Sequence, residues 1–326
     1  MKRFFALLLA FVLCAGLTAC GGEKQPAGEE KENVIINFPT ASASGALYAV
    51  GAAITNLWSS QLEYVQAASQ ASSGGIENLN LVSEGEAQVS IAISSNCWQC
   101  LNGTDSFEGY AYEDLKVIAG LYLNPNQMVV TEASGIEGLA DVRGKHFAVA
   151  SAGSSVYGEC QNHFTAAGLQ FPDDIDCEYI TFADAADLLQ NGSIDGAWIM
   201  SGAPASAVTQ ACSAGCRLVG VDGDILDKLR EEYPWYAAYT IPAGTYPGQT
   251  QDVETSAIKM VMFCRGDLDE ETVYDLTRTL WENIDALGES QAVLQGLTPE
   301  AAVVDIADLP LHEGAARYYR EIHVID

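Results

Sequence analysis

The chain has 326 residues, and its 44 acidic and 15 basic side chains give it a formal net charge of −29 at pH 7. Such a negative chain repels nucleic acid and anionic lipid, which excludes nucleic-acid binding as its main activity. Hydrophobic residues make up 48% of the chain, enough for packed cores, which excludes an intrinsically disordered protein.

The N-terminus has the features of a secretory signal. Lys2 and Arg3 precede an apolar run within residues 1–19, and Cys20 follows a Leu-Thr-Ala tripeptide. This run resembles the bacterial lipobox, which implies a lipoprotein signal peptide over residues 1–19 and lipidation at Cys20. The alternatives are an ordinary signal peptide and a buried core segment. We expect an extracytoplasmic protein that is lipid-anchored to the cell membrane.

A polar tether is expected to follow the lipidated cysteine. Residues 20–32 are rich in glycine, proline and charge and have no apolar periodicity, so they cannot bury enough surface to fold. Beyond them, no run of about 18 apolar residues occurs, and we expect a soluble body over residues 33–326.

In the body, short β-branched runs alternate with helical patterns. Strands are predicted at 34–38, 62–68, 89–93, 146–150 and 197–200. Helices are predicted at 46–59, around 76–82, from 94, from about 156 to 167, at 183–190, from 202, and as one long helix at 269–287. This alternation predicts an α/β fold with largely parallel sheets.

Five predicted strand-to-helix loops consist mainly of small and hydroxylated residues. They are residues 40–45, 72–75, 94–96, 151–155 and 201–204. Helix N-termini offer unpaired N–H groups, and ligands of open α/β sheets bind beyond the carboxyl ends of the strands. A single loop of this kind is better explained as a helix cap. Five of them favour a binding site for a small anion such as a carboxylate.

Four motifs carry a family resemblance. They are S-S-G-G-I-E-N-L at 72–79, I-D-G-A-W through G-A-P at 194–204, I-P-A-G-T-Y-P-G-Q at 241–249, and L-H with G-A-A-R-Y-Y at 311–319. The body resembles the TAXI subfamily of solute-binding subunits of TRAP transporters, and the run 241–249 is the most specific match. The first loop departs from the family pattern, because Ala41 and Ser42 replace glycines. The third loop departs as well, because Ser95 stands where aspartate is common in the family.

The resemblance implies an α/β, two-lobed, periplasmic-binding-protein-like (type II) fold. Lobe I would comprise residues 33–123 plus 242–326, lobe II residues 124–241, with crossovers near Leu123 and Ile241. A small carboxylate of the glutamate, glutamine or 2-oxo acid class would bind between the lobes and pass to ion-driven TRAP permease subunits. The implied ligand-binding residues are Gly45, Tyr48, Ser72, Ser73, Gly74, Ser94, Ser154, Ser155, Gly202, Pro204 and Tyr246.

Two other functions stay open. The same fold would serve an ABC-type or sensory solute-binding lipoprotein. Cys97 and Cys100 form a C-x-x-C at a predicted helix start, which fits an extracytoplasmic thiol-disulfide protein as well as two packed or disulfide-bonded cysteines. We identify no catalytic, cofactor or metal motif and expect no enzyme. The pairing of the seven cysteines after Cys20 cannot be deduced from sequence.

Overall fold

The computed structural model describes residues 31–41, 43, 46–151 and 154–326. The predicted signal peptide, Cys20, most of the tether and Gly45 lie outside this part. Residues Val34–Asp326 form one compact unit, which is the unit described below.

The strands of this unit are β1 Val34–Pro39, β2 Val65–Gln70, β3 Val89–Ile93, β4 Leu115–Val130, β5 His146–Ala148, β6 Asp176–Glu178, β7 Gly196–Met200, β8 Arg217–Val219, β9 Tyr236–Ile241 and β10 Val253–Arg265. Its helices are α1 Ala46–Gln61, α2 Gly75–Ser83, α3 Ser94–Asn102, α4 Ser155–Ala166, α5 Phe182–Gln190, α6 Ser206–Ser213, α7 Gly223–Glu232, α8 Glu270–Glu282, α9 Ile284–Ser290 and α10 Glu313–Glu321.

The sheets are mixed, so the expectation of largely parallel sheets is wrong. Strands β1 and β2 form a parallel pair, and β5 is parallel to both β6 and β7. However, the long strand β10 is antiparallel to β3, β4 and β9, and β4 is antiparallel to β7 and β8. Ten of the 13 residues of β10 are buried, which agrees with the apolar run Met260–Cys264 in its second half.

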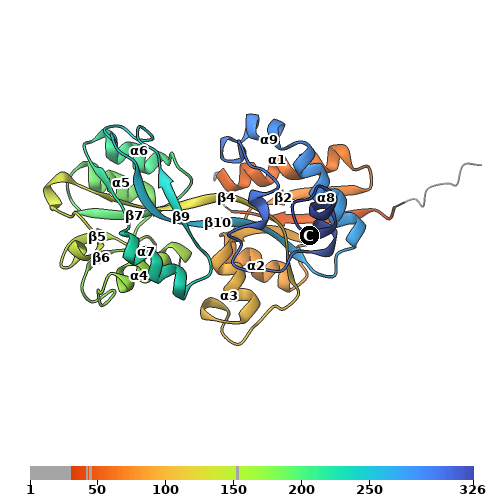
Figure 1. Ribbon diagram of the computed structural model, residues 1–326, viewed down its shortest axis with the longest axis horizontal. Coiled ribbons are helices and arrows are strands. Elements are labelled where there is room, and N and C mark those ends of the chain that lie inside the picture. The colour runs from red at the N-terminus through yellow and green to blue at the C-terminus, as the bar shows by residue number, and fades with distance from the viewer. Residues whose placement is uncertain (1–30, 42, 44–45, 152–153) are drawn as a thin grey trace, which may run out of the picture. The chain divides into compact units, whose positions relative to one another are not determined.

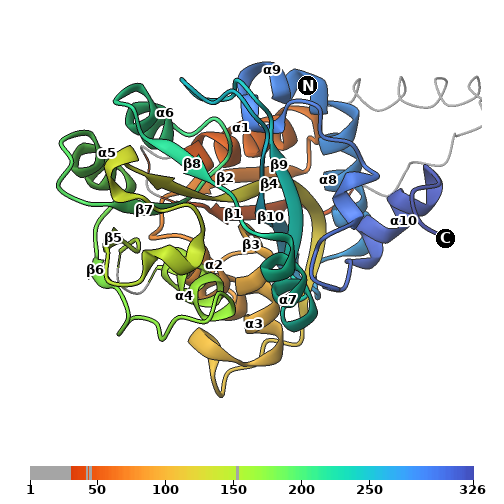
Figure 2. The same cartoon turned by 60° about the vertical axis from the view of Figure 1, so that its left-hand side comes forward.

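Strands β4 and β10 run side by side through the unit (Figures 1 and 2). The first part of β4 pairs with β10, and its last part, from Asn126 to Val130, pairs with β7. In the same way β10 pairs with β9 over its first half and with β3 over its second half. Figure 1 shows α4 to α7 at one end of these strands and α1, α2, α3, α8 and α9 at the other. The lobe boundaries at residues 123 and 241 stay a prediction.

The apolar stripe predicted for the first helix forms its buried face. Val50 and Ile54 are fully buried on α1, and Trp58, one turn further, is buried with them. The indole of Trp58 stacks on Phe38 and donates a hydrogen bond of 3.0 Å to the carbonyl of Leu276 on α8. An aromatic ring with one polar atom thus joins β1, α1 and α8.

The long helix predicted at 269–287 is two helices, which corrects that prediction. Asp269 caps α8 by accepting a hydrogen bond of 2.8 Å from the Thr272 backbone N–H. The helix ends at Glu282, because Asn283 has φ −122° and ψ 14° and its side-chain amide donates to the carbonyl of Thr279. Asparagine side chains compete for backbone hydrogen bonds in this way, which favours helix ends over helix interiors.

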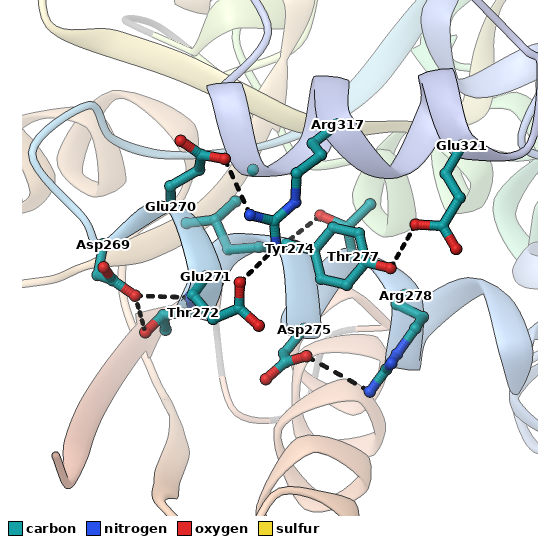
Figure 3. Close-up of polar contacts among 12 residues, drawn as sticks. Asp269, Glu270, Glu271, Thr272, Tyr274, Asp275, Thr277, Arg278, Arg317 and Glu321 are labelled. Carbon is teal, nitrogen blue, oxygen red and sulfur yellow. Dashed lines mark hydrogen bonds and ion pairs between the residues drawn. The ribbon is translucent and has the colours of Figure 1, made fainter. Parts of the chain in front are cut away.

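The C-terminal motif packs α10 against α8 (Figure 3). A Cβ atom at Gly314 would lie 2.2 Å from the backbone oxygen of Glu270, so no other residue allows this approach. Arg317 on α10 pairs with Glu270 at 2.9 Å and lies 4.0 Å above the ring centroid of Tyr274. These residues have a structural role in joining the two helices.

Candidate functional site

The first turns of α2 and α4 border a common cavity of about 600 Å³. We call it the α2–α4 cavity. Its lining residues are Ser73, Gly74, Gly75, Ile76, Glu77, Asn80, Ser154 and Ser155. The structure thus brings together four of the residues predicted to bind a ligand, namely Ser73, Gly74, Ser154 and Ser155. They come from two loops that lie 80 residues apart in the chain.

Local sequence explains how each helix begins at this cavity. Gly74 has φ 121° and ψ −162°, a conformation that side chains other than glycine rarely adopt, and α2 begins directly after it. Ser154 precedes α4, and its hydroxyl accepts a hydrogen bond of 3.3 Å from the backbone N–H of Tyr157. The early N–H groups of a helix have no partner within it, so both helix ends favour an anion.

A buried asparagine holds the loop before α2 in place. The Asn78 amide donates to the carbonyls of Thr40 at 2.7 Å and Ile91 at 2.9 Å, and its oxygen accepts from the Ser72 hydroxyl at 2.6 Å. Ser72 therefore contributes to the framework and does not line the α2–α4 cavity. Sequence analysis missed Asn78, although it lies in the matched run 72–79.

Glu77 is a second residue that sequence analysis missed. Its carboxylate accepts hydrogen bonds from the backbone N–H of Ser73 at 2.6 Å and from the Ser73 hydroxyl. The hydroxyl bond, followed by the backbone bond, lowers the pKa of Glu77 below its usual value. The donors of Ser73 are therefore engaged by a carboxylate of the chain itself. An acidic residue in the first helical turn signals this arrangement.

A second cavity, of about 370 Å³, lies between α3, α4 and the segment after α7, and we call it the α3–α4 cavity. Its lining residues are Ile76, Ser95, Asn96, Gln99, Asp105, Ser106, Ser154, Ser155, Tyr157, Gly158, Glu159, Gln161, Asn162, Tyr233 and Trp235. The two cavities share Ile76, Ser154 and Ser155, so they adjoin at the first turn of α4. Among these described residues the charged ones are acidic.

Glu159 is the most unusual group in the α3–α4 cavity. It is 3% exposed, and its carboxylate accepts hydrogen bonds from the Tyr236 hydroxyl at 2.5 Å and the Ser95 hydroxyl at 3.3 Å. Burial raises the pKa of Glu159 to about 7, against the lowering effect of the two hydrogen bonds. Ser95 is the position at which the resemblance leads us to expect aspartate, and here its hydroxyl donates to an acidic residue.

The other predicted ligand-binding residues within the described part line neither cavity. Tyr48 is half-buried on α1, and Ser94 is fully buried at the start of α3, where its hydroxyl has no hydrogen-bond partner among the described residues. Gly202 and Pro204 lie in the segment between β7 and α6, and a Cβ at Gly202 would be 3.6 Å from Val293. Their roles in ligand binding stay predictions.

Tyr246 is 2% exposed and belongs to the core formed mainly by β7, α5 and α6. Its hydroxyl donates to the side-chain oxygen of Gln127 and accepts a hydrogen bond of 2.9 Å from the backbone N–H of Ala205. Burial raises its pKa to about 12. The aromatic residue of the most specific motif thus joins β4 to the start of α6.

The C-x-x-C lacks the features of an activated thiol pair. Cys97 and Cys100 are both buried on α3, and burial raises the pKa of Cys97 well above its usual value and that of Cys100 to about 12. A nucleophilic cysteine needs a lowered pKa and access to solvent. The seven described cysteines are all unpaired thiols.

The described residues contain neither a candidate metal centre nor a candidate membrane-spanning helix. In that part of the chain no three histidine, cysteine, aspartate or glutamate side chains are grouped so as to hold a metal ion. The same part contains no helix with the length and apolar character needed to cross a bilayer.

Known proteins of similar sequence or structure indicate one fold for this chain. The sequence model of the NMT1-like family matches residues 38–322. PhnD1 from Prochlorococcus marinus, solved with methylphosphonate, is 11% identical over 89% of this chain and 99% of its own, with a TM-score of 0.52. A protein of Bordetella bronchiseptica RB50 is 15% identical over 89% and 98%, with a TM-score of 0.52. The periplasmic aliphatic sulphonate binding protein SsuA from Escherichia coli is 16% identical over 91% and 95%, with a TM-score of 0.49.

At these identities the likeness concerns the fold alone. The chain has the mixed α/β, two-lobed fold of periplasmic solute-binding proteins, which confirms the predicted fold class. The starts of α2 and α4 lie at one cavity, and the assignment of these helices to two lobes stays a prediction.

Proposed function

The chain belongs to the NMT1-like family, and from that premise we propose that it is an extracytoplasmic receptor for a small organic acid, which it delivers to a membrane transporter. The observation that carries this proposal is the meeting of the α2 and α4 N-termini at one cavity. Its volume, about 600 Å³, lies within the range of about 300–1,000 Å³ that is usual for small-molecule sites.

The chemistry of this cavity suits an acid group. Backbone N–H groups and hydroxyls at two helix N-termini would hold a carboxylate without a basic side chain. Small residues at 73–75 and 154–155 let the ligand approach the backbone closely. Binding between two lobes and closure around the ligand would then involve no bond chemistry, so the protein would not be an enzyme.

The finer assignment rests on the sequence motifs. They favour a TAXI-type receptor for glutamate, glutamine or a 2-oxo acid, with TRAP permease subunits as partners and Cys20 as the lipid anchor. An ABC-type or sensory receptor is the alternative of the same fold. A thiol-disulfide protein is less well supported, since burial disfavours the thiolates of Cys97 and Cys100.

A thermal-shift panel on the refolded full-length chain tests the proposal. Refolding removes any solute carried through purification. The panel contains L-glutamate, L-glutamine, 2-oxoglutarate, C4-dicarboxylates, branched-chain 2-oxo acids and neutral sugars. A ligand at 100 times its dissociation constant adds about 2.7 kcal/mol of stability. We expect a shift with at least one acid and none with the sugars. Stabilisation by a sugar and by no acid would contradict an acid receptor.

A further inference from the structure

The α3–α4 cavity contains a buried carboxylate without a counter-ion. Glu159 is 3% exposed, and it forms no ion pair with any described basic side chain. The lining residues include one other acidic side chain, Asp105, and no described lysine, arginine or histidine. Its hydrogen-bond partners are two neutral hydroxyls, those of Tyr236 and Ser95. A buried charge without an opposite charge is costly, which is why buried carboxylates normally have a cationic partner.

The same cavity contains an acceptor that has no donor. Asn96 is 4% exposed, and its side-chain oxygen has no hydrogen-bond partner among the described residues. Its amide nitrogen donates to the Gln99 side-chain oxygen at 3.2 Å, which leaves the Asn96 oxygen as the unpaired atom. Buried polar atoms without a partner are rare in folded proteins and need an explanation.

Aromatic rings border this group of oxygen atoms. Tyr233 and Trp235 both line the cavity, and their ring centroids are 5.0 Å apart at an interplanar angle of 34°. The face of an aromatic ring attracts a cation, most strongly in a tryptophan. Carboxylate and amide oxygens beside aromatic rings therefore form a suitable environment for a cationic nitrogen.

We propose that the α3–α4 cavity is a subsite for an ammonium group of the solute, with Glu159 and Asn96 as its acceptors. This inference rests on the proposed receptor function and narrows the solute class. The carboxylate would lie at the N-termini of α2 and α4, and the ammonium group would lie next to Glu159. The adjoining cavities share Ser154 and Ser155, so one small molecule would contact both. The solute is then an amino acid in the broad sense, and not a 2-oxo acid or a dicarboxylate.

An ammonium group would complement both acceptors. It has three N–H donors and no acceptor, and it would meet the Asn96 oxygen, which lacks a donor, and the Glu159 carboxylate, whose donors are two neutral hydroxyls. Its charge balances that of Glu159, whose raised pKa shows how poorly the empty cavity supports the ionised form. A neutral hydrogen-bond network around a protonated Glu159 is the competing explanation.

Matched pairs of probes separate these explanations. Calorimetric titration of the full-length chain would compare L-glutamate with glutarate and 4-aminobutanoate with butanoate, since each pair differs in the amine alone. Butylammonium, which has no acid group, tests the subsite by itself. We expect each amine to bind at least tenfold more tightly than its counterpart. Equal affinity within both pairs would overturn the subsite.

Two variants test the named acceptors. Glu159→Gln keeps the shape of the side chain and removes the charge, and we expect it to weaken amine binding at least tenfold without affecting glutarate. Asn96→Leu should also weaken amine binding, and it tests the subsite if the Glu159→Gln variant does not fold. Glu231→Gln is the matched control, because this glutamate is exposed and lines neither cavity.

The outcomes distinguish the two proposals. Unchanged amine binding in Glu159→Gln would refute the subsite while the receptor function stands. Binding of butylammonium with no binding of any acid would refute the acid receptor and keep the subsite. Binding of a 2-oxo acid or a dicarboxylate with no binding of butylammonium or any amino acid would refute the subsite alone. If the wild-type chain binds neither butylammonium nor any acid of the panel, both proposals are wrong.

Discussion

The two cavities that meet at the first turn of α4 differ in the polar groups that border them. The α2–α4 cavity is bordered by helix N-termini, whose N–H groups are donors, and the α3–α4 cavity by carboxylate and amide oxygens. Among the described lining residues neither cavity has a basic side chain. The comparison shows that helix N-termini can provide a positive potential where no basic side chain is present. Carboxylate side chains provide the negative potential in the adjoining cavity. Together they would orient a dipolar solute.

The largest expected effect concerns the pH dependence of stability caused by Glu159. Its pKa is about 7 in the folded state and near 4.5 in the unfolded chain, so between these values the folded state holds a proton that the unfolded state has lost. Stability therefore falls as pH rises from about 4.5 to 7. Relative to Glu159→Gln, the wild-type chain should lose about 2–3 kcal/mol of unfolding free energy between pH 5 and pH 8.

Urea unfolding of both proteins at several pH values measures this loss. The comparison with the variant is needed because His163, also on α4, has an opposite effect. Burial lowers the pKa of His163 to about 4, so its contribution to stability is lost as pH falls from about 6.5 to 4. This effect is common to both proteins and cancels in the difference. Parallel pH profiles for the two proteins would show that Glu159 is not buried as described.

A smaller expected effect distinguishes two roles of the Ser154 hydroxyl, namely capping of α4 and ligand binding at the α2–α4 cavity. Ser154→Ala removes the cap of α4, which should cost about 1 kcal/mol of stability. Thr181→Ala is a matched control, since Thr181 caps α5 by accepting from the Asp184 N–H at the same 3.3 Å and lines neither cavity.

Both variants should lose similar stability in urea unfolding, and Ser154→Ala alone should weaken the binding of glutarate or of the acid found in the panel. Equal affinity of the two variants for that acid would mean that the Ser154 hydroxyl serves the helix only. The donor role would then be left to the backbone N–H groups.

Local features of the fold follow from the sequence, and distant ones do not. Strand β3 and the start of α3 agree with prediction, because an apolar run followed by Ser94 and Ser95 is decided by neighbouring residues. The antiparallel pairing of β4 with β10 was missed, because it joins segments more than 100 residues apart and leaves no local pattern.

The candidate site likewise contains residues that local sequence predicts and residues that depend on distant contacts. Predicted loop residues such as Ser73 and Ser154 meet at one cavity because each lies at the start of a helix. Glu159 could not be found from the sequence, because its partners Ser95 and Tyr236 lie 64 and 77 residues away. A glutamate in the middle of a helical pattern is expected at the surface, and only its tertiary contacts make it unusual.

The smallest expected effect concerns Glu77, the acidic residue that contradicts the donor character of the α2–α4 cavity. Its carboxylate occupies the Ser73 donors, so a ligand carboxylate at this place must displace it. Glu77→Gln should therefore strengthen glutarate binding by about threefold, a modest gain because the group is exposed and screened by solvent. Glu84→Gln, at the other end of α2 and outside both cavities, controls for net charge. Weaker glutarate binding in Glu77→Gln, with no change in the control, would instead make Glu77 a partner of the ammonium group and place the negative end of the site in the α2–α4 cavity.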